Sequence, residues 1–439
     1  MATLDPQAVL QGRLGPRRSS VGFVIGVAVL SFLTLISVLV VGLPEGGPVL
    51  FLVGLLLAVL PAPITVAGIL LLDRLEPEPT RNLVIAFLWG AGVATLVAGV
   101  INTANSAVAT VILGRGLGMF LTVAVGAPLV EESLKGFVLL GLLWFRRREL
   151  DGPTDGIVYA GMVGLGFAIV ENVGYYARFG AEGELIPVFL LRGVISPLAH
   201  PLFTSMIGIG IAYAALSRSG AARFFLPVLG WCGAVFLHAF WNGSSFISAI
   251  FQLPLITQLP LGLVIAWLFT FLVLVGVLLL VMHDRRRIVA LIGRHLSQYV
   301  PTGLVASQDI AMLSAISSRR AARRWARRAG GSVASRAMGD YQLAATELAL
   351  LHTRAERGVE TPPQFYPRRD ALLHLMGVAR QAFLSRLSGG TQLPWAQAGP
   401  PGFGPPPPPT GPPGTPRSSG PPGPQPGPPR PPGWPPGPG

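Results

Sequence analysis

Acidic, histidine and amide side chains recur within stretches of this sequence that are otherwise apolar. An ionisable side chain is costly to place inside a lipid bilayer, so such residues usually serve a function there. Carboxylates can act as general bases on water, histidines can position water or bind a metal, and an amide can donate to an oxyanion. This combination suits peptide hydrolysis. The catalytic candidates are Glu131, Glu132, Glu171, His200, His238 and Asn242, with Lys135, Asn172 and Arg192 as supporting residues.

Spacing along a helix decides which of these groups can pair. Glu131 and Glu132 lie four and three residues before Lys135, so the lysine can pair with one of the two carboxylates. Two adjacent residues on a helix point in different directions. We therefore expect one glutamate, by preference Glu131, to be the general base and the other to bond Lys135. His238 and Asn242 are also four residues apart and share a face, which suits Asn242 to donate to the oxyanion.

Hydrolysis by this set has two forms, with and without a metal. The sequence contains no H-E-x-x-H motif, which excludes an ordinary zincin, and no suitably placed Ser, His and Asp for a serine mechanism. Glu171, His200 and His238 could ligate a divalent metal such as zinc, or they could hold water alone. Both forms stay open, and we expect Arg192 to pair with a buried acid rather than to catalyse.

The surrounding sequence is that of a membrane protein. Hydrophobic residues make up 51% of the 439 residues and charged residues only 12%, with a mean hydropathy of +0.58, whereas soluble domains carry about 25% charged residues. A helix needs about 20 apolar residues to cross a bilayer, and the chain predicts an all-α bundle of about eight crossings. Pro197 is expected to break the sixth of them. The predicted crossings are Val21–Leu43, Val49–Leu72, Leu83–Val100, Leu117–Phe145, Gly156–Tyr176, Leu185–Leu216, Phe224–Phe246 and Leu261–Met282.

The positions of the arginines orient these crossings. Arginines cluster before the first crossing, in every second loop and after the last crossing, and an excess of Lys and Arg marks the cytoplasmic side. Both termini are therefore predicted to be cytoplasmic. In this topology the acids and histidines of crossings four to seven lie about 21–25 Å from the cytoplasmic ends, at one level. We expect them to form one polar layer.

The composition changes after the last crossing. Arginines repeat every four residues between Arg319 and Arg328, which predicts a basic helix face that lies against anionic lipid headgroups. The net charge of +13 describes the cytoplasmic face, and no nucleic-acid partner is expected. The single cysteine, Cys232, excludes an intrachain disulfide. The predicted regions are a cytoplasmic N-terminus (1–20), a transmembrane protease-like domain (21–282), a basic helical cytosolic region (283–398) and a Pro/Gly-rich disordered tail (399–439).

Five motifs in order carry a family resemblance. They are D-R-x-E-P-E-P at 73–79, E-E-x-x-K at 131–135, D-G to G-x-G-F-A-x-x-E-N at 155–172, the segment around His200 after Arg192, and H-x-x-x-N at 238–242. With them the chain resembles the PrsW family of polytopic intramembrane proteases, and more distantly the CAAX-prenyl endopeptidases. In the latter a histidine stands where this chain has Glu171.

The resemblance implies a bacterial cytoplasmic (inner) membrane enzyme that cleaves membrane-anchored proteins, such as anti-sigma factors. Two other classes of protein stay open on the residues alone. Proton-coupled small-solute transporters also place Glu and His at the bilayer midplane, and a non-catalytic membrane protein could bind clients without cleaving them. Proteolysis is the preferred interpretation.

Overall fold

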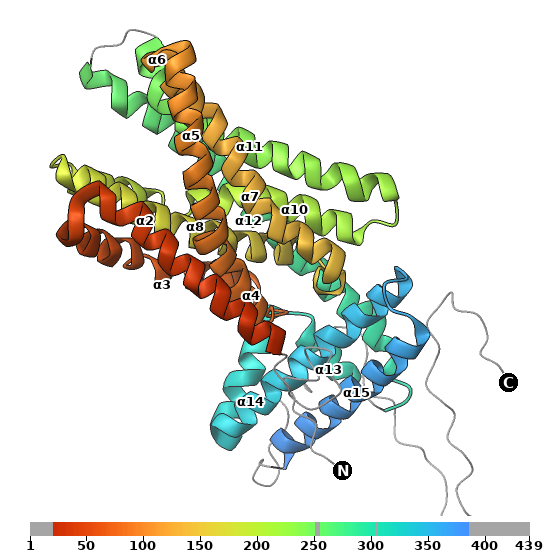
Figure 1. Ribbon diagram of the computed structural model, residues 1–439. Coiled ribbons are helices and arrows are strands. Elements are labelled where there is room, and N and C mark those ends of the chain that lie inside the picture. Colours follow the sequence, from red (N-terminus) through yellow and green to blue (C-terminus); the bar gives the residue numbers. More distant parts are fainter. Residues whose placement is uncertain (1–20, 251–254, 304, 386–439) are drawn as a thin grey trace, which may run out of the picture. The chain divides into compact units, whose positions relative to one another are not determined.

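The chain folds into helices throughout the part that the structure describes. The structure is a computed structural model that describes residues 21–250, 255–303 and 305–385, and all of its regular elements are helical (Figure 1). This confirms the predicted all-α class. The described residues fall into two compact units, one within residues 17–285 and one from residue 286 onward. The predicted N-terminal segment and the Pro/Gly-rich tail lie outside the described residues.

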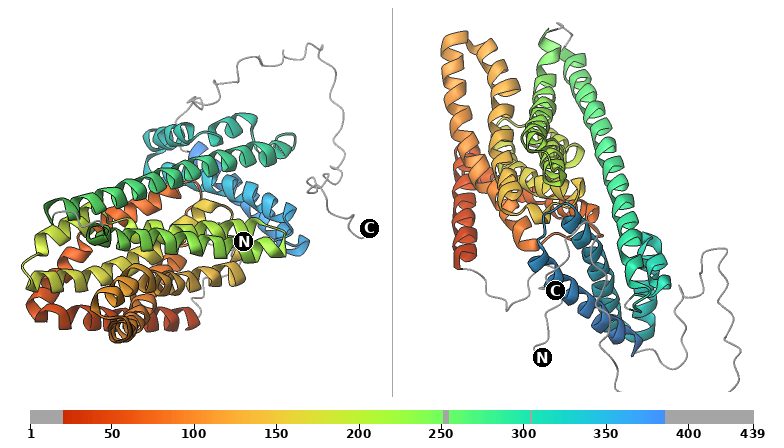
Figure 2. Two further views of the ribbon diagram at one scale, coloured as in Figure 1. Left: turned by 90° about the horizontal axis from the view of Figure 1, so that it is seen from above. Right: turned by 90° about the vertical axis from the view of Figure 1, so that its right-hand side faces the viewer.

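The first unit is a bundle of long helices (Figure 2), which confirms the predicted polytopic architecture. Several of these helices contain a short π-helical segment, and π-helical turns are frequent near functional sites. The π-helical segments are η1, η2 and η4, and η3 is a 3₁₀ turn in a loop. The bounds are α2 Val21–Val59, α3 Ala62–Leu72, α4 Thr80–Leu88, η1 Trp89–Ala94, α5 Thr95–Leu113, α6 Arg115–Leu121, η2 Thr122–Gly126, α7 Ala127–Phe145, η3 Arg147–Glu149, α8 Pro153–Ala181, α9 Leu185–Phe189, η4 Leu190–Ile195, α10 Ala199–Leu216, α11 Gly220–Ile250 and α12 Leu255–Leu296.

The described residues contain seven helices long and apolar enough to cross a membrane, one fewer than predicted. The difference lies at the start, where the first two predicted crossings form one candidate of 52 residues, Val21–Leu72. The chain reverses inside it at Gly47, whose positive φ of 71° favours glycine. Gly42 and Gly54, on opposite sides of this reversal, both approach Val173 of α8. In Figure 1 the red ribbon of α2 accordingly turns back on itself.

Helix α8 forms the centre of the first unit. In its most apolar 18-residue window 89% of the residues are buried, against 6% for the first candidate span. It contacts α2, α4, α7 and α10. Two glycines let α10 approach closely, because a Cβ on Gly156 would lie 2.1 Å from the backbone oxygen of Gly208, and one on Gly164 would lie 2.7 Å from the His200 backbone. These close approaches place the start of α10 beside the middle of α8.

The predicted break in the sixth crossing is confirmed. The π-helical segment η4 ends at Ile195, and α10 begins at Ala199, so Ser196 and Pro197 lie between two helices. Pro197 cannot donate a backbone hydrogen bond, and its ring excludes a continuous helix. The break allows residues on both sides of it to face the same interior space.

The second unit contains the end of α12 and three further helices. Its longest helix reverses at Gly330 and Gly331, where the backbone is not helical. As a consequence Arg319 folds back and donates to Thr346 Oγ1 at 3.0 Å and to the Gln342 carbonyl at 2.9 Å. Arg319 is buried, so it does not belong to the exposed basic face that the sequence predicts. The bounds are η5 Ser297–Tyr299, α13 Ser307–Leu313, α14 Ile316–Glu356 and α15 Pro362–Leu384.

Candidate functional site

The polar residues of the helical bundle meet in one layer. Five elements contribute the predicted residues: α7, α8, η4, α10 and α11. These elements run in alternating directions and place their polar residues at a similar level along the bundle. The positions of the loop arginines predict such a layer. The structure brings together all the predicted residues: Glu131, Glu132, Lys135, Glu171, Asn172, Arg192, His200, His238 and Asn242.

A buried lysine joins the two neighbouring glutamates of α7 to α10. Lys135 Nζ donates to Glu132 Oε1 at 2.9 Å and lies 3.6 Å from Glu131 Oε2. The same ammonium lies 3.1 Å from His200 Nδ1 and 3.8 Å from the centre of the Phe167 ring. An ammonium can only donate, so His200 Nδ1 accepts from it. Glu132 therefore has the shorter bond to the lysine, and Glu131 has the longer contact.

Glu132 also orients the histidine of α11. Its Oε1 lies 3.0 Å from His238 Nδ1, and its Oε2 accepts from the Thr204 hydroxyl at 3.0 Å. A carboxylate next to Nδ1 fixes the hydrogen on that nitrogen, so Nε2 of His238 carries the lone pair. This lone pair faces Glu131, whose Oε2 lies 3.8 Å away. Glu132 thus has the position of the carboxylate that, in many metal sites, orients a metal-binding histidine through its second nitrogen.

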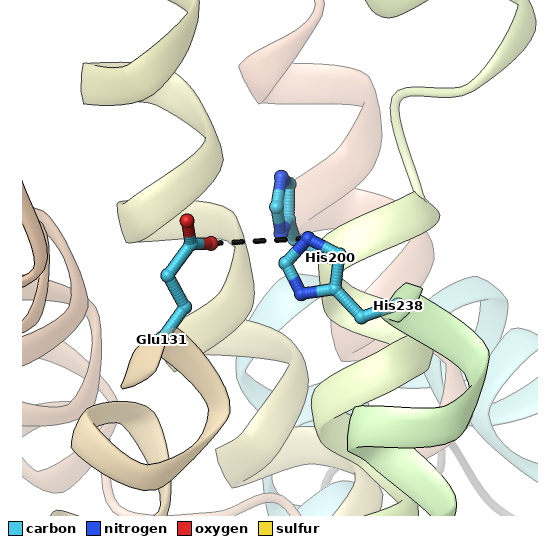
Figure 3. A group of neighbouring side chains, drawn as sticks. All are labelled: Glu131, His200 and His238. Carbon is cyan, nitrogen blue, oxygen red and sulfur yellow. Dashed lines mark ion pairs between the residues drawn. The ribbon is translucent and has the colours of Figure 1, made fainter. Parts of the chain in front are cut away.

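Glu131 has one satisfied oxygen and one unsatisfied oxygen. Its Oε1 accepts from Asn102 Nδ2 of α5 at 3.2 Å. Its Oε2 is buried and has no hydrogen-bond partner among the described residues. Figure 3 shows this carboxylate directed at the two imidazoles. The separation from His238 is longer than a hydrogen bond and suits a bridging water or ion.

A second acid lies on the other side of the histidine pair. Glu171 Oε2 accepts from Arg192 Nη2 and lies 2.9 Å from His200 Nε2. Arg192 also donates through Nε to Asn172 Oδ1 at 2.5 Å, and its guanidinium lies 3.8 Å from the centre of the Tyr175 ring. Arg192 is therefore in contact with a buried acid. Since Nδ1 of His200 accepts from the lysine, its Nε2 carries the hydrogen that is donated to Glu171.

A small cavity lies against this side of the layer. Its volume is about 30 Å³, enough for water but not for a peptide. Asn242 lines it and donates through Nδ2 to the Val123 carbonyl of η2 at 3.0 Å. The polar lining offers a place where water can meet the histidines. The polar lining residues are Glu171, Asn172, Arg192, His200, His238 and Asn242.

The donor atoms fit a divalent metal. Ligand atoms of Glu131, His200 and His238 all lie within 4.8 Å of one another, and two nitrogens with one carboxylate oxygen are ligands that zinc accepts. This group includes Glu131, whereas the sequence suggested Glu171, whose carboxylate forms an ion pair with Arg192. His200 would have to release one of its two present partners to join.

The formal charges of the layer agree with this fit. Glu131, Glu132 and Glu171 bring three negative charges, and Lys135 and Arg192 bring two positive charges. One negative charge is left over in a buried site, where an unbalanced charge is costly. A cation held by Glu131 and the two histidines would supply positive charge, and so would a single proton.

Sequence reasoning missed three residues that touch the predicted set. Asn102 lies beyond the end of the third predicted crossing, which was set at Val100, although α5 continues to Leu113. Thr204 follows His200 by four residues on the same helix face, a spacing that could have identified it. Phe167, part of the G-x-G-F motif, covers Lys135.

A second polar cluster surrounds the motif at 73–79, outside the spans. Glu78 accepts from the Tyr159 hydroxyl at 2.6 Å, and the backbone N–H of Glu78 donates to Asp73 Oδ2 at 2.8 Å. Burial, together with the charge of Asp155, raises the pKa of Glu78 well above its ordinary value. Burial and Asp155 likewise raise the pKa of Asp73. This cluster anchors the loop to the start of α8.

Comparisons with known proteins agree with these motifs. Residues 78–283 match the model of the PrsW family of intramembrane metalloproteases. "Protease PrsW" of Clostridioides difficile (strain 630) is 32% identical over 154 residues, 35% of this chain and 62% of that protein. "Protease PrsW" of Shouchella clausii (strain KSM-K16) is 33% identical over 139 residues, 32% of this chain and 60% of that protein.

A third relative, "Protease PrsW" of Geobacillus kaustophilus (strain HTA426), is 37% identical over 82 residues, 19% of this chain and 34% of that protein. The matched part of the chain thus spans between about a third and three-fifths of these curated relatives. No solved structure matches the chain.

Proposed function

We propose that this chain, whose residues 78–283 match the PrsW family model, is an intramembrane endopeptidase that cleaves membrane-anchored proteins, in the manner of anti-sigma-factor processing. The chain is a multi-pass membrane protein, and we place it in the bacterial cytoplasmic membrane with both termini inside. The observation that carries the proposal is the buried Glu131 Oε2, which has no hydrogen-bond partner among the described residues and lies 3.8 Å from His238 Nε2.

The reaction uses a water molecule held at this pair. Glu131 takes a proton from the water, and the oxygen attacks the carbonyl carbon of the scissile bond. Asn242 lines the cavity that His200 and His238 also line, and it donates to the oxyanion that forms. Glu131 then returns the proton to the leaving nitrogen, so that the bond breaks and the base is restored. The residues that orient the site are Glu132, Lys135, Glu171, Asn172, Arg192 and His200.

A divalent metal fits the same site. Glu131, His200 and His238 would hold it, and Glu131 would then be a ligand in place of its role as the free base in the metal-independent form. Such an ion would polarise the water and lower the energy needed to deprotonate it. Glu132 would keep His238 in the required tautomer through its bond to Nδ1.

Exposed arginines of α14 form a surface that fits anionic lipid headgroups. Arg320, Arg324, Arg327 and Arg328 are exposed, and within the described residues none of them forms a salt bridge. Each arginine near an anionic surface contributes about 1 kcal/mol of attraction. We therefore propose that these four arginines bind anionic lipid. The surface is narrower than the basic face predicted from the sequence, which included Arg319.

The proteolytic function is tested in cells. Wild type, Glu131→Gln and His238→Ala are produced at equal levels, and quantitative membrane proteomics records which single-pass proteins accumulate uncleaved. A common set of accumulating proteins in both variants supports proteolysis. Unchanged cleavage products would exclude it, and flux across vesicles driven by a proton gradient would instead support transport.

A further inference from the structure

We propose that Asn102 of α5 is a positioning residue that aims the carboxylate of Glu131 at the histidine pair. This inference rests on the proposed function, since it assigns a role in the same reaction. Asn102 belongs to none of the motifs of the sequence and lies outside every predicted crossing. Its role follows from its contact with Glu131.

The contact fixes the orientation of the carboxylate. Asn102 Nδ2 donates to Glu131 Oε1 at 3.2 Å. The two oxygens are fixed to one carboxylate carbon, so a donor on one of them restricts where the other points. The other oxygen, Oε2, lies 3.8 Å from His238 Nε2. Asn102 thus positions the reactive oxygen Oε2 through its hydrogen bond to Oε1, without touching the reacting atoms.

A competing group makes this support necessary. Lys135 lies 3.6 Å from Glu131 Oε2, and the same ammonium already bonds Glu132. Without a donor on Oε1, the Glu131 carboxylate would be free to rotate toward this ammonium and away from His238. Asn102 is the hydrogen-bond donor to Glu131 within the part of the chain that the structure describes.

The environment of Asn102 also points to a functional position. Of the six residues from Val100 to Asn105, Asn102 is half-buried and the other five are exposed. Its Oδ1 is buried and has no hydrogen-bond partner among the described residues. A buried amide used for structure alone would normally have both of its ends satisfied. Here Nδ2 donates to Glu131, and Oδ1 has no hydrogen-bond partner among the described residues.

The test compares Asn102→Leu, Asn102→Asp and Asn102→Ala with a matched control. Asn105 lies on the same helix three residues later and is exposed, so Asn105→Leu makes the same chemical change away from the site. Full-length protein in nanodiscs is assayed for kcat and KM on the membrane-anchored protein that accumulates most in cells carrying Glu131→Gln. Thermal unfolding is recorded for each variant.

We expect Asn102→Leu to lower kcat about 10- to 100-fold, because a misplaced catalytic group costs about that much. KM and the unfolding midpoint should stay at the values of Asn105→Leu. Asn102→Asp has nearly the same shape but loses the donor and adds a like charge beside Glu131, so it should be at least as slow as Asn102→Leu. A role in packing alone gives the opposite order, with Asn102→Asp close to wild type and Asn102→Leu unstable.

Two outcomes would overturn the inference: a kcat for Asn102→Leu within twofold of the control, or an Asn102→Asp variant as active as wild type. If Asn102→Asp fails to fold, Asn102→Ala decides the question, because it removes the donor without adding a charge. An inactive Glu131→Gln beside a fully active Asn102→Ala refutes the role of Asn102 only. A fully active Glu131→Gln refutes the proposed function itself.

Discussion

Glu132 Oε1 and His238 Nδ1 lie 3.0 Å apart, and this bond between α7 and α11 decides which nitrogen of the imidazole faces Glu131. The two adjacent glutamates therefore have different surroundings. Glu132 is bonded to Lys135, Thr204 and His238 and is fully buried. Glu131 keeps one oxygen without a hydrogen bond. One glutamate organises the layer, and the other is available to react.

The two glutamates should differ in their effect on stability. Glu132→Gln leaves the buried Lys135 without its closest charge partner, and breaking such a pair costs about 3–5 kcal/mol. Glu131→Gln retains an oxygen that can accept from Asn102, so its stability should stay close to that of wild type. Thermal unfolding in detergent measures both. Both variants should lose cleavage activity. Equal unfolding midpoints for the two variants would contradict the division of roles between the glutamates.

Metal content provides a separate check on the site. Because the three ligand atoms are already assembled, we expect about one zinc ion per chain after reconstitution, measured by mass spectrometry of the metal. His238→Ala and Glu131→Gln should lose the ion. Glu171→Gln should keep it, since Arg192 occupies Glu171. Undiminished cleavage after exhaustive chelation would show that Glu131 and the histidines act on water alone.

The loop at 73–79 should make stability depend on pH. The raised pKa of Glu78 means that its carboxyl binds a proton more tightly in the folded than in the unfolded protein. Its contribution to stability is thus present below its ordinary unfolded pKa of about 4 and is lost as pH rises toward the folded-state value. Glu78→Gln keeps an acceptor for Tyr159 and removes the charge.

We therefore expect Glu78→Gln to raise the unfolding midpoint at pH 8 by about 2–4 °C and to flatten its decline between pH 5 and 8. The control is Glu182→Gln, at an exposed position. Parallel pH curves for wild type and Glu78→Gln would show that this carboxyl does not contribute to the dependence.

Anionic lipid should protect from hydrogen exchange the part of α14 that carries Arg320, Arg324, Arg327 and Arg328. Full-length protein in nanodiscs of phosphatidylcholine, with or without phosphatidylglycerol, is compared by hydrogen exchange. Amides of residues 317–329 should exchange at least tenfold more slowly with the anionic lipid, because each of the four arginines contributes about 1 kcal/mol of attraction. Replacing Arg320, Arg324, Arg327 and Arg328 by glutamine should remove the effect, and Arg336→Gln should not. Protection by added RNA in place of lipid would identify a nucleic-acid surface.

Much of the site could be predicted from the sequence because helical spacing is regular. The pairing of Lys135 with a neighbouring glutamate follows from a separation of three or four residues, and the common height of the histidines follows from the positions of the loop arginines. Spacing within one helix cannot show which acid a distant arginine contacts. For this reason the ligand group was expected to contain Glu171, whereas the structure groups Glu131 with the histidines.

Other features depend on chain reversals and on helix length. Gly47 reverses the chain between the first two predicted crossings, but the helical residues on both sides run on without a separate loop, so Val21–Leu72 forms one long candidate span. Gly330 and Gly331 reverse α14 and bury Arg319, a consequence that periodicity alone does not reveal. Asn102 was missed because an apolar window ends before it, while the helix continues.

The most direct measurement is the cleavage of membrane-anchored clients by Glu131→Gln beside Glu182→Gln, at equal expression and with membrane proteomics as the readout. Both variants remove one glutamate charge, but only Glu131 faces the histidine pair, whereas Glu182 is exposed. The account predicts that the same single-pass proteins accumulate uncleaved with Glu131→Gln and are processed normally with Glu182→Gln. Normal processing in both variants would contradict a proteolytic site at this layer.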